Sequence, residues 1–399
     1  MHLSNAEELV PIINQIMANW PHSFSDASSE QVPFMSINGE NEGKFRCLAT
    51  GNVEAKSWNA LNAVCDLIAE LSWEQIRTFP SRLCVHCAAV EFNGRLVLFP
   101  NRRRAGKSQL AAVLAYRGHR LFTDDFLSIT ASPDSGILGV ANGILPRVRL
   151  PQPAEMSKGF EDWVRNNNGP ENFQYKYLES DAVVDRNTKL PVGAIVLLDR
   201  RQTAAPELRP IDPATALNEL ISQNFARSTH AGHILKTAHQ IVSSAELFDL
   251  SYTGAEEAAD LLEATFEVWN QPSVDTEKFP MLTPREADLE AQSKPAPQFD
   301  VLQAYIQETG ATVVDVGEET YLADAEGIGV LRLNGTSGAI WRLLASSMTL
   351  ADVVYILSEA FPSVPADQIH RDCSRVLKDL VQNRLIACVN RAQLAAHED

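Results

Sequence analysis

The chain has 399 residues, of which 45% are hydrophobic and 21% are charged, and its formal net charge is −17. This composition is ordinary for a globular protein, and the length is sufficient for two or three domains that each have a core. The strong acidity argues against a broad nucleic-acid-binding surface or a surface for anionic membranes. We therefore expect neither nucleic acid nor membrane among the partners.

Six cysteines occur in the chain, and the first residues contain neither a basic segment nor an apolar one. We interpret this as the absence of a secretory signal, which predicts reduced thiols and a cytoplasmic location. Nowhere does an apolar run approach the roughly 18 residues that a transmembrane helix requires. The sequence therefore predicts a cytoplasmic protein.

Residues 1–80 are predicted to form a helical preamble that packs on the domain that follows. Apolar residues at helical spacing predict a short helix around Leu9–Ile16 and a longer one around Leu61–Leu71. The segment between them is rich in serine and is predicted to be a loop. Because no combination of residues here indicates chemistry, we expect a structural role for this part.

The stretch Leu83–Ile129 contains the motif on which the functional interpretation depends. Asn93-Gly94 separates two apolar runs and predicts the tight turn of a hairpin, because both residues accept positive φ. The second run is followed by N-R-R-R-A-G-K-S and by apolar residues at helical spacing that stop at a glycine. The next predicted strand ends at Asp124 and Asp125. A strand, a phosphate loop, a helix and a strand with an acidic end are the parts of a P-loop site, so we predict nucleotide binding.

The predicted nucleotide-binding residues belong to the loop and the first helical turn: Asn101, Arg102, Arg103, Arg104, Ala105, Gly106, Lys107 and Ser108. Amides at a helix start point toward an anion, and Gly106 permits close approach to phosphate oxygens. Lys107 is expected to reach the β- and γ-phosphates of ATP. Ser108 and a carboxylate after the next strand, Asp125, are assigned to Mg²⁺. The other carboxylate, Asp124, is expected to accept a proton from an attacking hydroxyl.

The loop departs from the usual G-x-x-x-x-G-K-[ST] pattern at its first position, which is Asn101. After glycine, asparagine is the residue that most readily accepts left-handed φ, so the loop can still close. Arg102, Arg103 and Arg104 are large for such a loop. Two interpretations stay open: the arginines add charge-assisted contacts to phosphate, or they fill the pocket.

Three segments carry a resemblance to a known family: V-H-C-A-A-V-E-F-N-G-R-L-V-L-F, A-G-K-S and R-G-H-R-L-F-T-D-D. They resemble the HPr serine kinase/phosphorylase family, and more closely the HPr-kinase-related proteins found beside peptide-modification genes. The resemblance implies a P-loop α/β domain over residues 81–270 that uses ATP and Mg²⁺. It also implies that His86 is the active-site histidine and that Asp124, with Asp125 beside it, is the general base. The family's downstream metal-binding glutamate has no counterpart in G-V-A-N-G-I-L-P-R-V-R-L.

Several histidines and cysteines also have structural interpretations. On residue pattern alone, His86 fits a hydrogen-bonded residue inside a strand as well as a catalyst. Cys84 and Cys87 form C-x-x-C, but no second pair completes a metal site, and residues three apart on a strand face opposite sides. For Ser228–His239, with its H-x-x-H spacing, we predict a solvent-exposed helix rather than a metal site.

Two further elements of the P-loop domain are predicted from local signals. The continuous apolar run Ala194–Leu198 predicts a strand that is buried on both faces. Asp212-Pro213 predicts a helix start, with the aspartate as N-cap and proline at the first helical position.

Residues 271–299 contain five prolines among polar residues and are predicted to be a linker. Beyond it, residues 300–395 are predicted to form a small α+β, winged-helix-like domain. Its expected strands are Ala311–Val316, Thr320–Leu322 and Val330–Leu333. Three helices follow, beginning near Thr336, after Thr349 and at Ala366. The last helix is nearly neutral, which argues against DNA binding.

The segments L-R-L-N-G-T-S-G-A-I-W-R-L-L, T-L-A-D-V-V and V-L-K-D-L-V-Q-N-R-L-I resemble PqqD-like peptide-recognition domains of ribosomal peptide modification systems. The resemblance implies that the domain binds the leader of a precursor peptide as an added strand at a sheet edge. The other partners it implies are peptide-modification enzymes. Trp341 is expected to lie in the core rather than to contact a ligand.

Together these features predict an ATP-dependent kinase-like enzyme that phosphorylates a serine or threonine hydroxyl of a precursor peptide held by the C-terminal domain. The alternative is a non-catalytic, nucleotide-binding adaptor that presents a leader peptide to another enzyme. The altered loop and the missing downstream carboxylate favour the adaptor.

Overall fold

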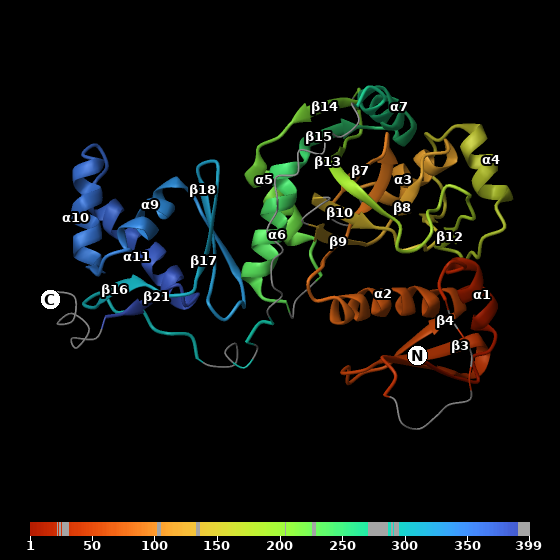
Figure 1. The fold of residues 1–399 in the computed structure, drawn as a ribbon, viewed down its shortest axis with the longest axis horizontal. Coiled ribbons are helices and arrows are strands. Elements are labelled where there is room, and N and C mark those ends of the chain that lie inside the picture. The colour runs from red at the N-terminus through yellow and green to blue at the C-terminus, as the bar shows by residue number, and fades with distance from the viewer. Residues whose placement is uncertain are drawn as a thin grey trace. The chain divides into compact units, whose positions relative to one another are not determined.

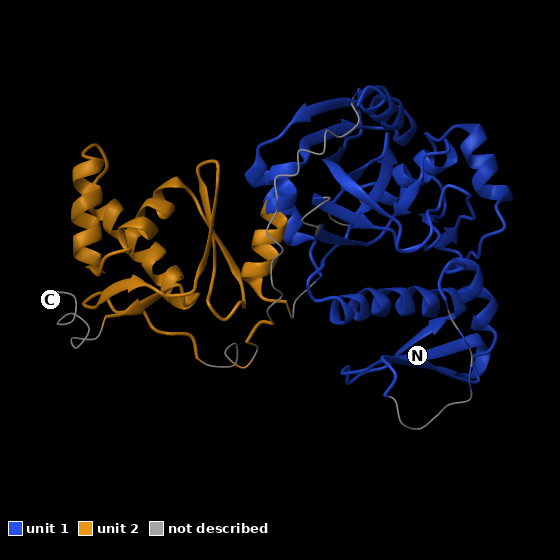
Figure 2. Ribbon diagram, viewed as in Figure 1, with its two compact units in different colours: residues 1–226, 240–282 blue, residues 227–239, 283–399 orange. Residues whose placement is uncertain are grey.

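The computed structural model describes residues 1–21, 23, 25, 32–101, 105–132, 136–203, 205–225, 229–269, 286–288, 290 and 295–389. The chain divides into two compact units, residues 1–226 with 240–282 and residues 227–239 with 283–399 (Figure 2). Most of the predicted linker, residues 271–299, lies outside the described residues, so its linker character stays a prediction.

The first 80 residues contain a sheet as well as helices. Its four strands are ordered as numbered: β1 (His2–Ser4), β2 (Met35–Gly39), β3 (Lys44–Ala49) and β4 (Lys56–Asn59). The helices are α1 (Leu9–Ile16), α2 (Ala60–Thr78) and the short 3-10 helix η1 (Asn41–Gly43). A purely helical preamble is therefore wrong. In β3, Phe45, Cys47 and Ala49 are buried and alternate with exposed residues, which is the strand period that the sequence analysis overlooked.

A nine-stranded sheet forms the centre of the first unit (Figure 1). Its strands are β5 (Leu83–Val85), β6 (Ala88–Phe92), β7 (Arg95–Phe99), β8 (Leu121–Thr123), β9 (Leu127–Ser132), β10 (Gly136–Val140), β13 (Lys189–Arg200), β14 (Glu207–Pro210) and β15 (Glu246–Tyr252). The order is β5-β9-β10-β13-β7-β6-β8, and β15 pairs with both β13 and β14. A separate two-stranded ribbon consists of β11 (Arg147–Arg149) and β12 (Tyr175–Tyr177).

Local sequence signals account for several of these elements. Asn93 and Gly94 both have positive φ, 45° and 79°, and join β6 to β7 as predicted. The predicted buried strand Ala194–Leu198 lies inside β13. The Asp212 side chain accepts a hydrogen bond from the Thr215 amide and caps α5, which begins at Pro213. These three predictions are confirmed.

The strand directions bring four strand ends to one edge of the sheet. Because β6 is antiparallel to both β7 and β8, those two strands run the same way. β13 is parallel to β7, and β15 is parallel to β13. The C-terminal ends of β7, β8, β13 and β15 therefore lie at the same edge, the usual place for a ligand in an open α/β sheet.

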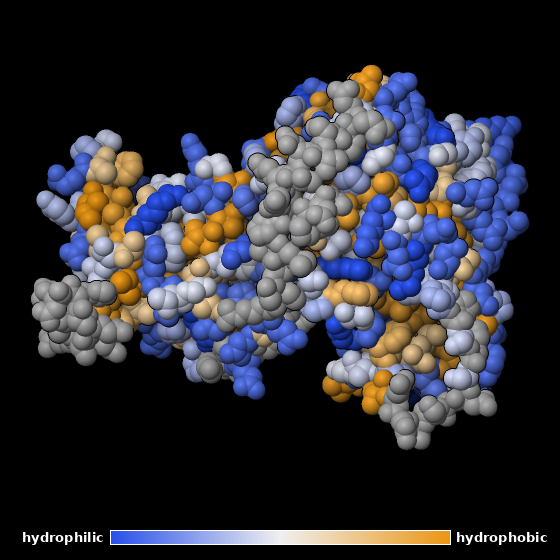
Figure 3. Space-filling model, in the orientation of Figure 1, coloured by the Kyte–Doolittle hydropathy of each residue, from blue (hydrophilic) through white to orange (hydrophobic). Residues whose placement is uncertain are grey.

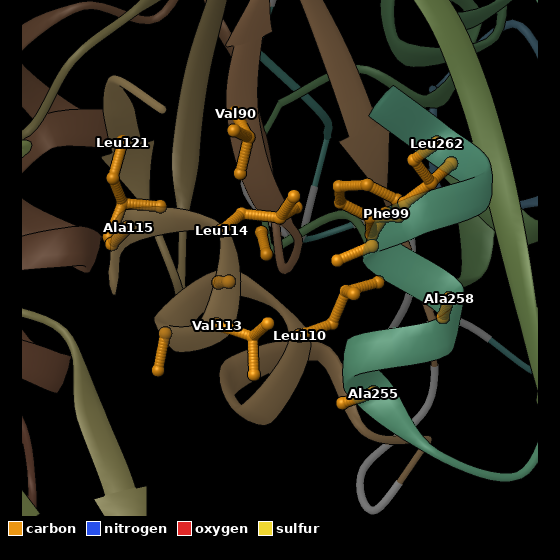
Figure 4. Close-up of a cluster of buried hydrophobic side chains, with 14 of the residues drawn as sticks. Val90, Phe99, Leu110, Val113, Leu114, Ala115, Leu121, Ala255, Ala258 and Leu262 are labelled. Atoms are coloured by element: carbon orange, nitrogen blue, oxygen red, sulfur yellow. The ribbon is translucent and has the colours of Figure 1, made fainter. Parts of the chain in front are cut away.

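The helices of the first unit are α3 (Lys107–Tyr116), α4 (Lys158–Asn166), α5 (Pro213–Ser222) and α7 (Ala255–Phe266). Helix α6 (Ala231–Ser244) is divided between the two units at residue 239. Helices α3 and α7 pack together over the sheet and share one hydrophobic core (Figure 4). In that core Leu110 and Leu114 of α3 lie with Ala258 and Leu262 of α7 and with Phe99 of β7, all of them fully buried. The core thus fixes the start of α3 next to the end of β7.

The C-terminal unit contains two three-stranded sheets, ordered β17-β18-β19 and β20-β16-β21. The strands are β16 (Ala304–Gln307), β17 (Thr312–Val316), β18 (Glu319–Ala323), β19 (Val330–Leu333), β20 (Met348–Thr349) and β21 (Ile386–Cys388). The helices are α9 (Gly335–Leu343), α10 (Leu350–Ala360) and α11 (Ala366–Gln382). The predicted strands and helices are present, whereas the sequence analysis missed the sheet made of β16, β20 and β21.

Packing and capping in this unit follow the sequence closely. Trp341 is 3% exposed and lies in the core, as expected. Thr349 caps α10 through a capping box with Asp352. Figure 3 shows hydrophobic surface over α10. The side chains of Tyr355, on this helix, and of Phe361, which follows its last residue, are 68% and 46% exposed.

The segment that carries the H-x-x-H spacing is not a solvent-exposed helix. His230 and His233 are buried, and the His230 ring accepts a hydrogen bond from the Gly232 amide and contacts the Ala325 carbonyl at 3.0 Å. The apolar residues between the histidines and after them place most of α6 in a core, so the exposure prediction is wrong. No helix among the described residues is long and apolar enough to cross a membrane.

Truncating Leu110 to alanine should lower the free energy of unfolding by about 2–5 kcal/mol, because it leaves a cavity between α3, α7 and the sheet. Urea unfolding of the full chain measures this. Val268→Ala is the matched control, since that side chain is 79% exposed and its loss should cost less than about 0.5 kcal/mol. Equal effects of the two substitutions would contradict the assigned core.

Candidate functional site

The start of α3 is shaped by a glycine that no other residue can replace without strain. Gly106 is the N-cap and has a φ of 98°, which disfavours any residue with a Cβ. A Cβ at this position would also overlap the Tyr252 hydroxyl. That hydroxyl, at the end of β15, donates a hydrogen bond of 3.0 Å to the Ala105 carbonyl. The first amides of α3 therefore face the sheet edge as a ready site for an anion.

Lys107 is buried, with 6% of its surface exposed, and its ammonium donates a hydrogen bond to the Asn101 carbonyl. Burial lowers the pKa of Lys107, although the carboxylates of Asp125 and Asp124 oppose that shift. The buried ammonium points at the loop, so it could donate hydrogen bonds to phosphate oxygens in place of the Asn101 carbonyl. Nucleotide binding by Lys107 stays a prediction, and this geometry supports it.

Asn101 ties the loop to the neighbouring strand. Its side-chain oxygen accepts a hydrogen bond of 2.7 Å from the Leu198 amide, and its side-chain nitrogen donates one of 3.1 Å to the Leu198 carbonyl. The Asn101 side chain thus continues the hydrogen bonding between β7 and β13 beyond the end of β7. The sequence analysis did not predict this role. Arg102, Arg103 and Arg104 lie outside the described residues, so both interpretations of these arginines stay open.

The two aspartates follow β8 in a tight turn that is held by side chains. The Thr123 hydroxyl accepts hydrogen bonds from the amides of Asp125 and Phe126, each at 3.1 Å, and from the Asn142 side chain at 2.9 Å. The Ser108 hydroxyl lies 3.5 Å from the Asp124 carbonyl. The structure therefore brings the predicted loop residue and the predicted acids together.

Asp124 is buried, with 6% of its surface exposed, and its carboxylate accepts a hydrogen bond of 3.3 Å from the Arg147 amide. Burial, with the charge of Asp125, raises the pKa of Asp124 to about 6, against the opposing effect of Arg147. Such a carboxylate is ionised at neutral pH yet remains basic enough to accept a proton.

Asp125 faces the other way, toward His86 and Arg147. Its two carboxylate oxygens lie 3.4 Å from His86 Nε2 and 3.3 Å from an Arg147 guanidinium nitrogen. Burial alone would raise the pKa of Asp125, but the hydrogen bond from His86 and the charge of Arg147 outweigh it and lower that pKa. Asp125 is therefore held ionised.

His86 is fixed by its neighbours rather than being a freely exposed side chain. Its amide donates a hydrogen bond of 2.9 Å to the Gln223 carbonyl, and its ring stacks on Phe225 at 5.8 Å between centroids. Both contacts come from the segment that follows α5. His86 lies between β5 and β6, so its expected place inside a strand is wrong, although it is hydrogen-bonded and contacts a predicted catalytic acid.

The sequence analysis missed Arg147, Tyr252 and Asn142. Arg147 lies in the segment G-V-A-N-G-I-L-P-R-V-R-L, which was noted only for its lack of a carboxylate. The two closely spaced arginines of that segment were the available signal. For Tyr252 and Asn142 there was none, because their roles depend on residues that are more than 15 positions away.

The two cysteines of the C-x-x-C motif lie in the interior of the first unit. Cys84 and Cys87 are buried and free, and burial raises the pKa of Cys84 to about 12 and that of Cys87 still further. In the described part of the chain, three or more His, Cys, Asp or Glu side chains do not gather into a metal cluster. The Ser108 hydroxyl and a nearby carboxylate are oxygen donors that suit Mg²⁺, which takes further ligands from phosphate and water. The assignment of Ser108 and Asp125 to Mg²⁺ stays a prediction.

Comparisons with known proteins connect this geometry to two families. Residues 319–386 match the family model described as Coenzyme PQQ synthesis protein D (PqqD). The HPr kinase/phosphorylase of Lachnoclostridium phytofermentans is 34% identical over 74 residues, which are 18% of this chain and 24% of that protein. The match therefore spans about a quarter of that relative's length.

The solved structure of the Hpr(Ser) kinase/phosphatase from Coxiella burnetii is 19% identical and covers 45% of this chain and 91% of that chain. Its TM-score is 0.24, and at that score the likeness carries no argument. The two sequence matches confirm the prediction that HPr-kinase-like sequence is joined to a C-terminal PqqD domain in one chain.

Replacing Gly106 by alanine should abolish nucleotide binding and destabilise the fold, because the new Cβ displaces Tyr252 and the φ is strained. Gly118→Ala separates the effect of backbone strain from that of the clash, since Gly118 has a φ of 91° but open space around it. This substitution should lower the free energy of unfolding by only about 1 kcal/mol. Adding Tyr252→Phe to Gly106→Ala should restore part of the stability. Urea unfolding and calorimetric ATP titration provide the measurements, and a harmless Gly106→Ala would refute the loop geometry.

Asp124→Asn should stabilise the protein above about pH 4. Because the folded state raises the pKa of Asp124 from 3.8 to about 6, ionising this group costs folding free energy that is absent well below pH 3.8, grows as the pH rises toward 6 and is fully present by pH 8. The variant should therefore match wild type near about pH 3 and exceed it by roughly 1–3 kcal/mol at pH 8. Thermal melts across this range test this, with the exposed Asp181→Asn as control. A pH-independent difference would contradict it.

Proposed function

We propose that this protein is an ATP-dependent kinase that phosphorylates a serine or threonine hydroxyl of a ribosomally made precursor peptide held by the PqqD domain. One observation carries the proposal: Lys107, Ser108, Asp124, Asp125 and His86 meet at one sheet edge beside the start of α3. The weak sequence similarity to an HPr kinase/phosphorylase supports the same chemistry.

Each residue has a role in the proposed transfer. The Lys107 ammonium and the α3 amides hold the β- and γ-phosphates, and Mg²⁺, once bound at Ser108 and a carboxylate, supplies positive charge to the phosphates. The peptide hydroxyl oxygen forms a bond to the γ-phosphorus while the bond from that phosphorus to the bridging oxygen breaks and ADP leaves. Asp124 takes the hydroxyl proton. His86 and Arg147 keep Asp125 ionised beside it.

The PqqD domain supplies the proposed peptide-binding surface. In the described residues β17 and β19 each pair with β18 alone, so each leaves an open edge. An extended leader can add to such an edge by backbone hydrogen bonds, with selectivity from alternate side chains. Covalent linkage of the two domains raises the effective concentration of peptide at the kinase site, commonly to about millimolar for short flexible linkers.

The test is to incubate the full chain with ATP, Mg²⁺ and the genetically adjacent precursor peptide, and to follow phosphate by mass spectrometry. Lys107→Ala should lower the rate by at least about 100-fold, because it removes a charge that stabilises the transferring phosphoryl group. Lys158→Ala, at an exposed lysine of α4, should behave as wild type. An unmodified peptide with wild type, or full modification with Lys107→Ala, would refute the kinase.

One observation favours the alternative, a non-catalytic nucleotide-binding adaptor. The Arg147 guanidinium contacts the carboxylate of Asp125, the acid assigned to the metal, and so offsets part of its charge. Calorimetry separates the two functions: ATP binding without turnover supports the adaptor, and turnover with peptide supports the kinase. Absence of ATP binding would remove both.

A further inference from the structure

The β11–β12 ribbon carries a ladder of arginine and tyrosine side chains that begins at the catalytic acids. Arg147 and Arg149 are two residues apart on β11 and therefore share a face. Across the ribbon they pair with Tyr177 and Tyr175. Both guanidinium groups lie against the same ring, with their carbons 5.3 Å and 5.4 Å from the Tyr175 centroid. The ribbon thus brings two cations to one aromatic ring.

The two arginines differ in whether a carboxylate forms an ion pair with them. Arg147 is mostly buried and contacts the Asp125 carboxylate, so its charge is used inside the site. Arg149 is exposed, and in the part of the chain that the structure describes no carboxylate pairs with it. Other exposed arginines of this acidic chain do have acidic partners, for example Arg165 with Asp162 and Arg209 with Glu207. Arg149 is therefore a solvent-exposed cation whose charge is available, two residues along β11 from the arginine that contacts Asp125.

We propose that Arg149, supported by Tyr175, is an acceptor-side subsite that binds a carboxylate of the substrate peptide two residues from the phosphorylated serine or threonine. The inference rests on the proposed kinase function. Its spacing follows from strand geometry: side chains two residues apart on a strand are about 6.6–6.8 Å apart. In the proposed complex the serine or threonine hydroxyl lies at Asp124, next to Arg147. If the peptide runs extended along β11, the residue two positions from that serine or threonine lies beside Arg149.

The chemistry of the subsite suits a carboxylate. The contact with the tyrosine ring restrains the guanidinium group, whose planar fork can donate two parallel hydrogen bonds to one carboxylate. Such charge-assisted pairs give geometric selectivity as well as affinity. Arg149 thereby selects acceptor peptides with aspartate or glutamate near the hydroxyl, and disfavours lysine at the same place.

The experiment uses the full chain with ADP and Mg²⁺ and three fluorescent peptides without a leader. Each peptide has one serine with aspartate, asparagine or lysine at both positions two residues away. Anisotropy should show the aspartate peptide binding about tenfold more tightly than the lysine peptide. Arg149→Glu should reverse that order. Tyr175→Ala should weaken the preference, and Tyr175→Phe should retain it because the ring remains.

Arg209→Glu is the matched control, since it reverses the charge of an exposed strand arginine away from the ribbon, and it should leave the order unchanged. If Arg149→Glu leaves the order of peptide affinities unchanged, the proposed subsite is refuted. Weaker ATP binding by Arg149→Glu with unchanged peptide binding also overturns it, and assigns Arg149 to the nucleotide phosphates.

The same peptides with ATP separate the subsite from the kinase. Phosphate transfer at equal kcat/KM to all three peptides, unaffected by Arg149→Glu, refutes the subsite and leaves the kinase standing. A reversed binding order with no phosphate transfer to any peptide or to the precursor refutes the kinase and leaves a carboxylate-binding subsite.

Discussion

The site depends on hydrogen bonds that tie both ends of the phosphate loop to neighbouring parallel strands. At one end the side-chain amide of Asn101 forms hydrogen bonds with the backbone N–H and C=O of Leu198 in β13. At the other end Tyr252, the last residue of β15, bonds the Ala105 carbonyl and packs against Gly106. Because both anchors belong to the sheet, the direction of the α3 amides is set by the sheet and not by the loop residues alone.

The turn after β8 gives two adjacent carboxyl groups different pKa values. Asp124 and Asp125 are adjacent, yet burial raises the pKa of Asp124, whereas His86 and Arg147 lower the pKa of Asp125. Two carboxylates with different proton affinities can take different roles, one as base and one as fixed charge. This arrangement costs stability, since an ionised Asp124 is buried with few partners, and such costs are typical of functional sites.

The proposed kinase and the acceptor subsite use one continuous feature, the arginines of β11. Arg147 connects the ribbon to the acids through its amide and its guanidinium, and Arg149 extends the same face toward solvent. In the proposed function the PqqD domain recognises the leader, so selection near the hydroxyl needs a second contact close to the chemistry. The proposed subsite on the ribbon would provide that contact within the domain that carries the α3 loop.

Local signals in the sequence were sufficient for the elements whose stability is local. The Asn93-Gly94 turn, the Asp212 and Thr349 caps and the order of parts around Gly106 depend on backbone preferences within a few residues. The sequence therefore located the loop before α3 and the two acids that the structure brings together, while their roles stay predictions.

Tertiary structure alone decided which distant groups complete them. The β16-β20-β21 sheet, the contact of Arg147 with Asp125 and the packing of Tyr252 on Gly106 each join segments that are far apart in the chain. Such pairings depend on strand order and on burial. Side-chain periodicity reports which face of an element is apolar, but it does not report which partner covers that face.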